Sequence, residues 1–178
     1  MKSIALLRGI NVGGKNKVAM ADLKACFEKV GFTNVATYIN SGNVIFDSEI
    51  MDAAKLVEMC EEAIEKQFGF HVVCSVISAK RLADTLKNAP SWWNSGDGKH
   101  NAIFVIAPKK AADIALEVGE AKLEYEQIAV HEPIIFWSAP LETFSRTRYS
   151  KIVGSKAYQH VTIRNANTTL KLAELSGA

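Results

Sequence analysis

The order of β-forming and helix-forming segments constrains the fold of this chain more than any other feature. Four short apolar segments lie between Ser3 and Ile77, and two longer segments with helical periodicity separate them. The predicted order is strand, helix, strand, strand, helix, strand. This is the order of the ferredoxin-like split βαβ motif, an antiparallel sheet with helices on one face.

Local signals fix the ends of the two helices. A helix is expected over residues 20–30, where Gly31 supplies the left-handed residue that ends it. A second helix is expected over residues 52–68, with Asp52 as its N-cap and Gly69 as its end.

A second cycle follows the turn-rich segment 90–100, which contains Trp92 and Trp93. One of these tryptophans is expected to fill a gap between two halves, and the alternative is an exposed ring that stacks on a ligand. We predict an α+β protein of two ferredoxin-like (split βαβ, alpha-beta plait) subdomains with antiparallel sheets, over residues 1–90 and 91–178. The expected elements of the second are strand 102–107, a helix from Pro108 bearing Ile114, Leu116 and Val118, hairpin 126–137, a short helix with Ile152, Val153 and Ala157, strand 161–163, and a last helix with Leu170, Leu172 and Leu175.

Composition excludes several classes of protein. The chain is 48% hydrophobic and 22% charged, and no apolar run approaches the ~20 residues of a membrane span. No signal-peptide pattern opens the sequence, so a cytoplasmic protein without a membrane partner is expected. The three cysteines and four histidines lack ligand spacing, and we therefore expect no disulfide framework, no metal site and no cofactor.

A glycine-rich segment, Leu7–Lys17, joins the first strand to the first helix. Its glycines allow backbone N–H groups to approach an anion, and the following helix N-terminus adds partial positive charge. The candidate ligand-binding residues in this segment are Arg8, Gly9, Asn11, Gly13, Gly14 and Lys15. The alternative is a turn that needs glycine for geometry alone. A Walker A loop is disfavoured, because Asn16 stands where a hydroxyl would bind Mg²⁺.

Further candidates lie in the turn 40–43 and in a basic segment near the C-terminus. Residues 143–173 contain six basic residues and no acidic one, whereas residues 109–142 contain seven acidic and three basic. Arginine grips phosphate or carboxylate through paired hydrogen bonds, so these groups are expected to converge on a cleft between the halves. Alternatively, the arginines pair with the acidic segment or join the subdomains. The additional candidates are Ser41, Asn43, Arg146, Arg148, Arg164 and Asn165.

Three segments together resemble a known bacterial family, domain of unknown function 1697. They are L-R-G-I-N-V-G-G at the start, T-Y-I-N-S-G-N-V-I-F at the hairpin, and S-R-T-R-Y-S-K with T-I-R-N-A-N-T-T-L-K-L near the end. The resemblance covers nearly the whole chain and implies two α+β subdomains, each similar to the ferredoxin-like arrangement. It implies no function. The motif positions it carries are Arg8, Gly9, Asn11, Gly13, Gly14, Ser41, Gly42, Asn43, Arg146, Arg164 and Asn165.

The residues favour a binding protein for a nucleotide or another anionic ligand. Nucleic acid has less support, because net charge is only +2 and the central strands carry Phe46 alone where RNA-recognition motifs stack bases. The alternative is a transferase or hydrolase acting on a phosphorylated small molecule. No G-x-S-x-G elbow supports a serine hydrolase.

Overall fold

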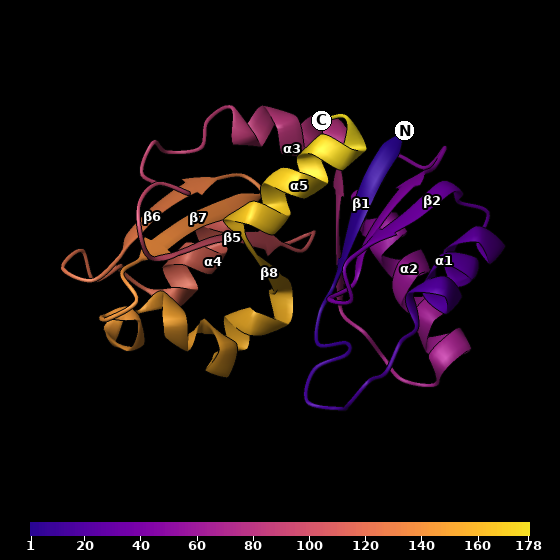
Figure 1. Ribbon diagram of the computed structural model, residues 1–178, viewed down its shortest axis with the longest axis horizontal. Coiled ribbons are helices and arrows are strands. Elements are labelled where there is room, and N and C mark those ends of the chain that lie inside the picture. Colours follow the sequence, from indigo (N-terminus) through magenta and orange to yellow (C-terminus); the bar gives the residue numbers. More distant parts are fainter. The chain divides into compact units, whose positions relative to one another are not determined.

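The computed structural model describes residues 1–178, and the chain divides into two compact units (Figure 1). Unit 1 comprises Met1–Leu82 and Leu172–Ala178, and unit 2 comprises Ala83–Lys171. Each unit contains one four-stranded antiparallel sheet. The α+β class and the two ferredoxin-like subdomains are therefore confirmed. The division into domains at residue 90 stays a prediction.

Unit 1 has the predicted order of elements. Its strands lie in the order β2-β3-β1-β4, with β1 and β3 in the centre. The elements are β1 (Lys2–Leu7), α1 (Met20–Lys29), β2 (Thr33–Tyr38), β3 (Asn43–Asp47), α2 (Ala53–Phe68), β4 (Cys74–Ser78) and α3 (Ala79–Leu86), of which α3 runs past Leu82 into unit 2.

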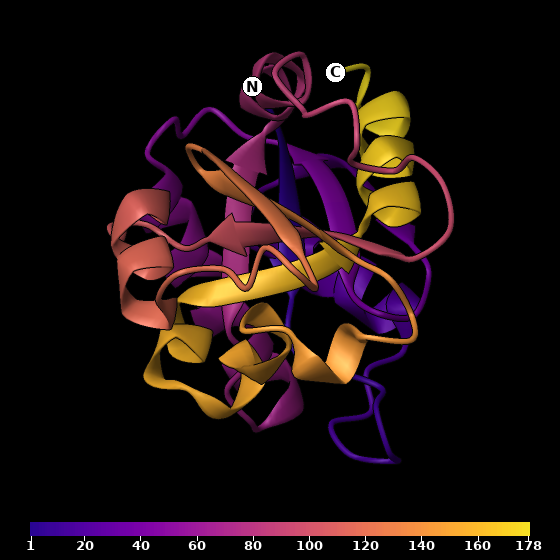
Figure 2. The same ribbon diagram turned by 90° about the vertical axis from the view of Figure 1, so that its left-hand side faces the viewer.

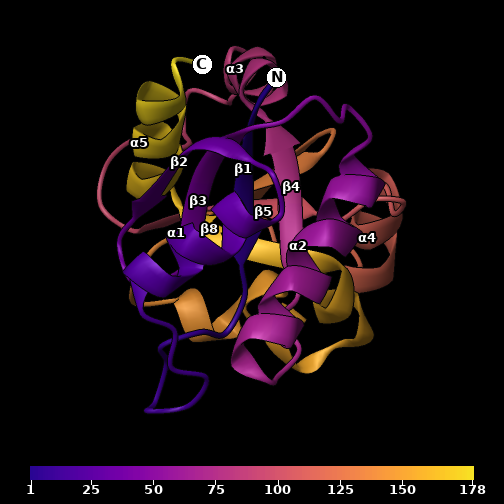
Figure 3. The ribbon, with the colours of Figure 1, turned by 90° about the vertical axis from the view of Figure 1, so that its right-hand side faces the viewer.

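Helices α1 and α2 cover one face of this sheet (Figure 3). The core contains Phe27 of α1, Phe32 beyond its end, and Phe46 of β3, with ring centroids 4.3–5.7 Å apart. Aromatic rings at such distances add to the stabilisation from burial. From Ser3 to Leu7, strand β1 is buried on both faces, as the apolar run Ile4–Leu7 predicts.

The predicted helix ends of unit 1 are confirmed. The Asp52 carboxylate accepts hydrogen bonds from the backbone of Ala54 and Lys55 at 2.9 and 3.2 Å. Gly31 and Gly69 have φ values of +99° and +79°, which side chains with a Cβ rarely adopt. These caps satisfy backbone groups that the helices leave unpaired.

Unit 2 repeats the strand order of unit 1, as β6-β7-β5-β8. The two units therefore have the same topology. This supports a repeat of the architecture, although the residues themselves show no repeat. Figure 2 shows the sheet and the short helical turns before β8. The elements are β5 (Lys99–Val105), α4 (Ala111–Val118), β6 (Gln127–His131), β7 (Ile134–Ala139), three 3-10 helices η1 (Phe144–Arg146), η2 (Tyr149–Gly154) and η3 (Lys156–His160), β8 (Val161–Asn165) and α5 (Ala166–Ser176), of which α5 runs past Lys171 into unit 1.

The short helix predicted around residues 152–157 is present as two 3-10 helices separated at Ser155, not as one continuous α-helix. Hydroxyl groups explain the difference. Thr147 Oγ1 donates to the Phe144 carbonyl at 2.7 Å, and Ser155 Oγ donates to the Ile152 carbonyl at 2.8 Å. Such bonds to the residue three positions earlier compete with the backbone bonds of an α-helix.

The helical periodicity of the sequence predicted more buried apolar residues in the second half of the chain than the structure contains. Helix α4 begins at Ala111 rather than Pro108, and Leu116 is 84% exposed. Val153 is 59% exposed, and only Leu172 of the three leucines in α5 is buried. Short helices bury few residues, so the pattern carries less information than in α2.

The two tryptophans of the segment 90–100 differ in environment. Trp93 is buried within unit 2, where its ring packs edge-on against Phe136 and its Nε1 donates to the Asn101 carbonyl at 2.8 Å. Trp92 is half-buried and lines a surface depression. Trp93 is therefore a core residue of unit 2, whereas the stacking of a ligand on Trp92 stays a prediction.

Candidate functional site

The glycine-rich segment folds into a small hairpin after β1. Lys15 N–H donates to the Val12 carbonyl at 3.1 Å, and Asn11 N–H donates to the Asn16 carbonyl at 3.1 Å. Gly13 and Gly14 have φ values of +59° and +76°, the type I′ pattern of two-residue hairpins. No atom lies within 4 Å of a Cβ built on either glycine. Both glycines are therefore required because of their positive φ, and not because a side chain would clash with a neighbour.

This geometry differs from a Walker A cradle. Two of its N–H groups, those of Asn11 and Lys15, bond within the hairpin instead of facing a phosphate. Helix α1 starts only at Met20, four residues beyond Asn16. The disfavoured nucleoside-triphosphatase interpretation therefore gains no support from the fold.

The Asn11 side chain fixes the base of the hairpin. Its Nδ2 donates to the carbonyls of Val18 and Asn40 at 2.9 Å each, while its Oδ1 accepts from Val18 N–H at 2.9 Å. Asn11 itself has φ +55°, which asparagine tolerates better than most residues. Its amide thus orders the loop, and its predicted contact with a ligand stays a prediction.

The turn 40–43 packs directly against this loop. The Gly42 carbonyl accepts from Leu7 N–H at 2.8 Å. A Cβ at Gly42 would lie 2.7 Å from Ile10 Cδ1 and 2.7 Å from Leu7 Cβ. Asn43 is buried and donates to the Tyr38 carbonyl at 2.9 Å and to Ser41 Oγ at 3.1 Å. Two of the three family motifs therefore form one structure in unit 1.

A surface depression of about 620 Å³ lies beside the loop. Lys17 and the first turn of α1 line it together with Asn11, Gly14 and Phe68. Ala19, the N-cap residue of α1, offers no side-chain hydrogen bond to the helix N-terminus. The depression thus combines an ammonium group with the positive end of a ten-residue helix.

The remaining candidates of the loop, Arg8, Gly9 and Lys15, are close in sequence to residues that line this depression. Arg8 is half-buried where β1 ends, and its N–H donates to the Val73 carbonyl at 3.0 Å. Gly9, with φ +72°, and Lys15 are exposed. Lys15 and Lys17 take part in no ion pair.

In unit 2, Arg146 and Arg148 belong to the segment of 3-10 turns. The buried Glu126 carboxylate accepts from the N–H groups of Lys122, Arg148 and Tyr149 at 3.0, 2.7 and 3.2 Å. The Arg146 guanidinium lies 5.8 Å from the centroid of the Tyr125 ring, a cation–π distance. Glu126 was not among the residues predicted from the sequence, since nothing in the sequence distinguishes it from neighbouring glutamates.

Arg164 and Asn165 lie where β8 meets α5. Arg164 is 9% exposed, and its Nη1 donates to the Ile163 carbonyl at 3.0 Å. The Asn165 Oδ1 accepts from Thr168 N–H at 2.8 Å, which confirms the predicted N-cap. The structure thus packs the loop of unit 1 against the turn 40–43. It places the candidates of unit 2 in two separate segments, Arg146 and Arg148 in the 3-10 turns and Arg164 and Asn165 where β8 meets α5. One cleft shared by both groups stays a prediction.

The structure contains no cluster of metal-ligating side chains and no disulfide bond. No three or more His, Cys, Asp or Glu side chains gather where they would hold a metal ion. All three cysteines are buried free thiols, and burial raises the pKa of Cys26 and Cys60. None of the helices is long and apolar enough to cross a membrane.

Fold and motifs together define a protein of two ferredoxin-like units with a glycine-rich hairpin after the first strand. Residues 1–136 match the family described as Protein of unknown function (DUF1697), and the chain belongs to that family. A solved structure of a conserved bacterial protein from Streptococcus pneumoniae, SP0830, is similar over 98% of both chains, with 33% identity and a TM-score of 0.87. No match was found among curated proteins. The resemblance inferred from the three motifs is confirmed.

Proposed function

We propose that this protein binds a phosphate-bearing small molecule, such as a nucleotide, in the depression beside the opening hairpin of unit 1. One observation carries the proposal: Lys17 and the uncapped first turn of α1 line the same depression. The first N–H groups of a helix lack partners within the helix, and they point toward a ligand at its N-terminus.

The charge distribution supports an anionic ligand. From Met1 to Ala21 the chain has four basic residues and no acidic one. Lys15 and Lys17 are both exposed, so their ammonium groups can reorient onto a phosphate. The hairpin is held in place by the Asn11 hydrogen bonds to Val18 and Asn40. Its lysines therefore project from an ordered loop.

Asp22 limits where the anion binds. It is the acidic residue of the first turn of α1 and lines the depression. Its carboxylate repels a second negative charge and already interacts favourably with the helix N-terminus. We therefore place the phosphate on the Lys17 side, and we expect neutralisation of Asp22 to strengthen binding.

The test is a thermal-shift titration with inorganic phosphate, pyrophosphate and ATP. A ligand at about 100 times its Kd adds roughly 2.7 kcal/mol of stability. Lys17→Ala should weaken binding at least about tenfold, if the charge-assisted contact contributes ~1.5 kcal/mol. The matched control is Lys24→Ala, which removes an equal charge from α1 at an exposed i,i+4 pair with Glu28.

Asp22→Asn separates a specific site from general charge attraction. Tighter binding in Asp22→Asn, with Lys24→Ala unchanged, supports the proposed depression. Equal losses in Lys17→Ala and Lys24→Ala would assign the effect to net charge and reject the site. The absence of any shift with all three anions would reject the function.

A further inference from the structure

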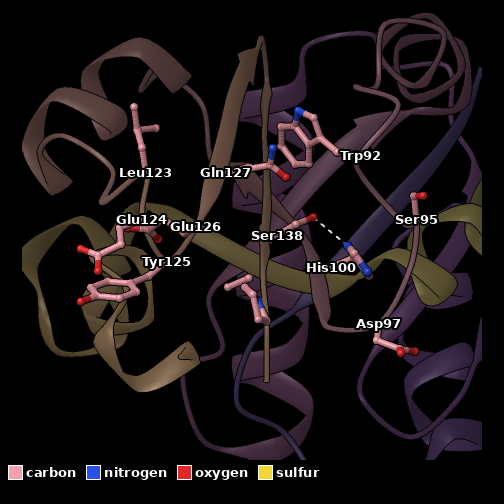
Figure 4. Close-up of a pocket in the computed structure, with 12 residues that line it drawn as sticks. Trp92, Ser95, Asp97, His100, Leu123, Glu124, Tyr125, Glu126, Gln127 and Ser138 are labelled. Atoms are coloured by element: carbon pink, nitrogen blue, oxygen red, sulfur yellow. Dashed lines mark hydrogen bonds between the residues drawn. The ribbon is translucent and has the colours of Figure 1, made fainter. Parts of the chain in front are cut away.

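We propose that unit 2 contains a second site, an acyl-transfer centre in which Ser138 is the nucleophile and His100 the general base. The inference goes beyond anion binding, because it concerns other residues and another chemistry. It rests on a hydrogen-bonded Ser–His pair inside a surface depression of about 340 Å³ (Figure 4).

The hydrogen bonds of His100 define the state of its ring. Nδ1 lies 2.8 Å from Ser138 Oγ, and Nε2 lies 3.2 Å from the Gly96 carbonyl oxygen. A carbonyl only accepts, so in the neutral imidazole Nε2 carries the proton. Nδ1 then has a free lone pair directed at the Ser138 hydroxyl. Nucleophile, base and a third group that orients the base are the general signature of covalent catalysis.

The sheet register places a third side chain beside this pair. His100 of β5 is the partner of Ser138 of β7, and Ser138 is the partner of Gln127 of β6. Paired residues share a face of the sheet, with Cβ atoms about 4.5–5.5 Å apart. All three residues line the depression. The Gln127 amide is thus positioned to donate a hydrogen bond to an oxyanion formed at a carbonyl that Ser138 attacks.

The walls of the depression indicate the class of substrate. Trp92 and Tyr125 are half-buried rings, suited to an apolar or aromatic group. Asp97 and Glu124 are exposed carboxylates at the same depression, and no lysine or arginine lines it. The Glu126 carboxylate is already bonded to backbone N–H groups. A neutral or cationic ester therefore fits, and an anionic one is repelled.

The reaction uses water as the only co-reactant. As Ser138 Oγ bonds to the ester carbonyl carbon, its proton moves to His100 Nδ1, and the carbonyl oxygen becomes the oxyanion held by Gln127. Collapse of this intermediate breaks the bond to the alcohol, which leaves with the proton from His100. A water molecule then gives its proton to His100 and attacks the acyl carbon. The carboxylic acid departs, and Ser138 regains its proton from His100.

The competing explanation is a cross-strand pair that only stabilises the sheet. A fluorophosphonate probe distinguishes the two, because it labels activated serines and not ordinary ones. Mass spectrometry of the labelled full-length protein should place the adduct on Ser138. Ser138→Ala should abolish labelling. Ser95→Ala is the matched control, since Ser95 is exposed and lines the same depression.

His100→Gln tests the base without relying on the serine variant. Its labelling rate should fall at least about 100-fold, the usual contribution of a general base. Turnover of p-nitrophenyl acetate should be lost in parallel. Circular dichroism checks that each variant is folded. An unlabelled wild type, an adduct on Ser95, or an undiminished rate in a folded His100→Gln variant would overturn the proposal.

Discussion

Asn11 and Val18 are joined by two hydrogen bonds of 2.9 Å, which pair the side-chain amide of Asn11 with both polar groups of the Val18 backbone. A third bond connects Asn11 to the Asn40 carbonyl. One side chain thereby closes the opening hairpin and anchors it to the turn 40–43. The family motif at Asn11 accordingly has a structural explanation that does not depend on a ligand.

Replacing Asn11 should destabilise the protein more than replacing another loop asparagine. Asn11→Ala removes three hydrogen bonds, and we expect a loss of about 2–3 kcal/mol in the free energy of unfolding. Asn16→Ala is the control, since Asn16 also has positive φ but donates one bond of 3.3 Å to Gly9. Urea denaturation measures both variants. Equal losses would mean that backbone strain, not the amide, carries the effect.

Gly42→Ala should be among the most damaging glycine substitutions. The new Cβ would lie 2.7 Å from both Ile10 Cδ1 and Leu7 Cβ, at φ +84°. We expect a loss of more than about 2 kcal/mol, because strain and steric overlap add. Gly69→Ala has a similar φ of +79° but no atom within 4 Å, so it should cost only about 1 kcal/mol.

The Gly42 variant also allows a rescue experiment. Ile10→Val removes Cδ1 and should recover part of the stability when combined with Gly42→Ala. Recovery should be incomplete, because Leu7 Cβ remains in contact. Additive losses in the double variant would contradict the proposed overlap with Ile10.

Glu126→Gln should destabilise unit 2 by about 2–4 kcal/mol. The amide keeps the size of the side chain but replaces a charged acceptor of three backbone N–H groups, leaving at least one buried donor poorly paired. Glu124→Gln is the control, because Glu124 is exposed and its loss should stay within about 0.5 kcal/mol. Guanidinium denaturation followed by tryptophan fluorescence compares them, and similar midpoints would exclude the buried role.

Tyr149 should make stability fall at alkaline pH. Burial, together with the Glu126 charge, raises the pKa of Tyr149 from 10.0 to about 12. Between these pH values the unfolded state loses the phenolic proton while the folded state keeps it, so the free energy of unfolding decreases as pH rises. The total decrease is on the order of 2 kcal/mol. Denaturation from pH 8 to about 12 should show this decrease, and Tyr149→Phe should remove it.

Tyr149→Phe should also be tolerated at neutral pH. The hydroxyl is buried without a hydrogen-bond partner, so its removal eliminates an unsatisfied polar group. We expect equal or higher stability than in the wild type. A marked loss would indicate that the hydroxyl forms a hydrogen bond in solution.

The fold of unit 1 was predictable because its signals are local and unambiguous. Asp52 caps α2, and glycines at positions 31 and 69 adopt the positive φ that their places in the sequence indicate. The 3-10 turns of unit 2 were not predictable. The spacing of Ile152 and Ala157 is compatible with an α-helix and with 3-10 helices. The hydroxyl hydrogen bonds of Thr147 and Ser155, which favour the 3-10 form, exist only in the folded segment.

The structure of the candidate site was predictable in part. The glycine-rich motif indicated a tight loop after the first strand, but it did not indicate that the Asn11 side chain would form hydrogen bonds with Val18 and Asn40. Binding of a ligand by this loop stays a prediction. His100 and Ser138 lie 38 residues apart and meet only through the register of β5 and β7. Side-chain pairs of this kind depend on strand pairing, which no local pattern specifies.

The 3-10 turns between β7 and β8 should open locally more readily than the helix that unit 1 has at the same place in the chain order. They occupy the place in the chain order that the 16-residue helix α2 has in unit 1. Short turns break with the loss of few bonds, so amide hydrogens over residues 144–160 should exchange with solvent far faster than those of α2. The amides of Arg148 and Tyr149, bonded to Glu126, should be the slow exceptions. The Glu126 carboxylate would then be the group that keeps this segment attached to the unit during such local opening.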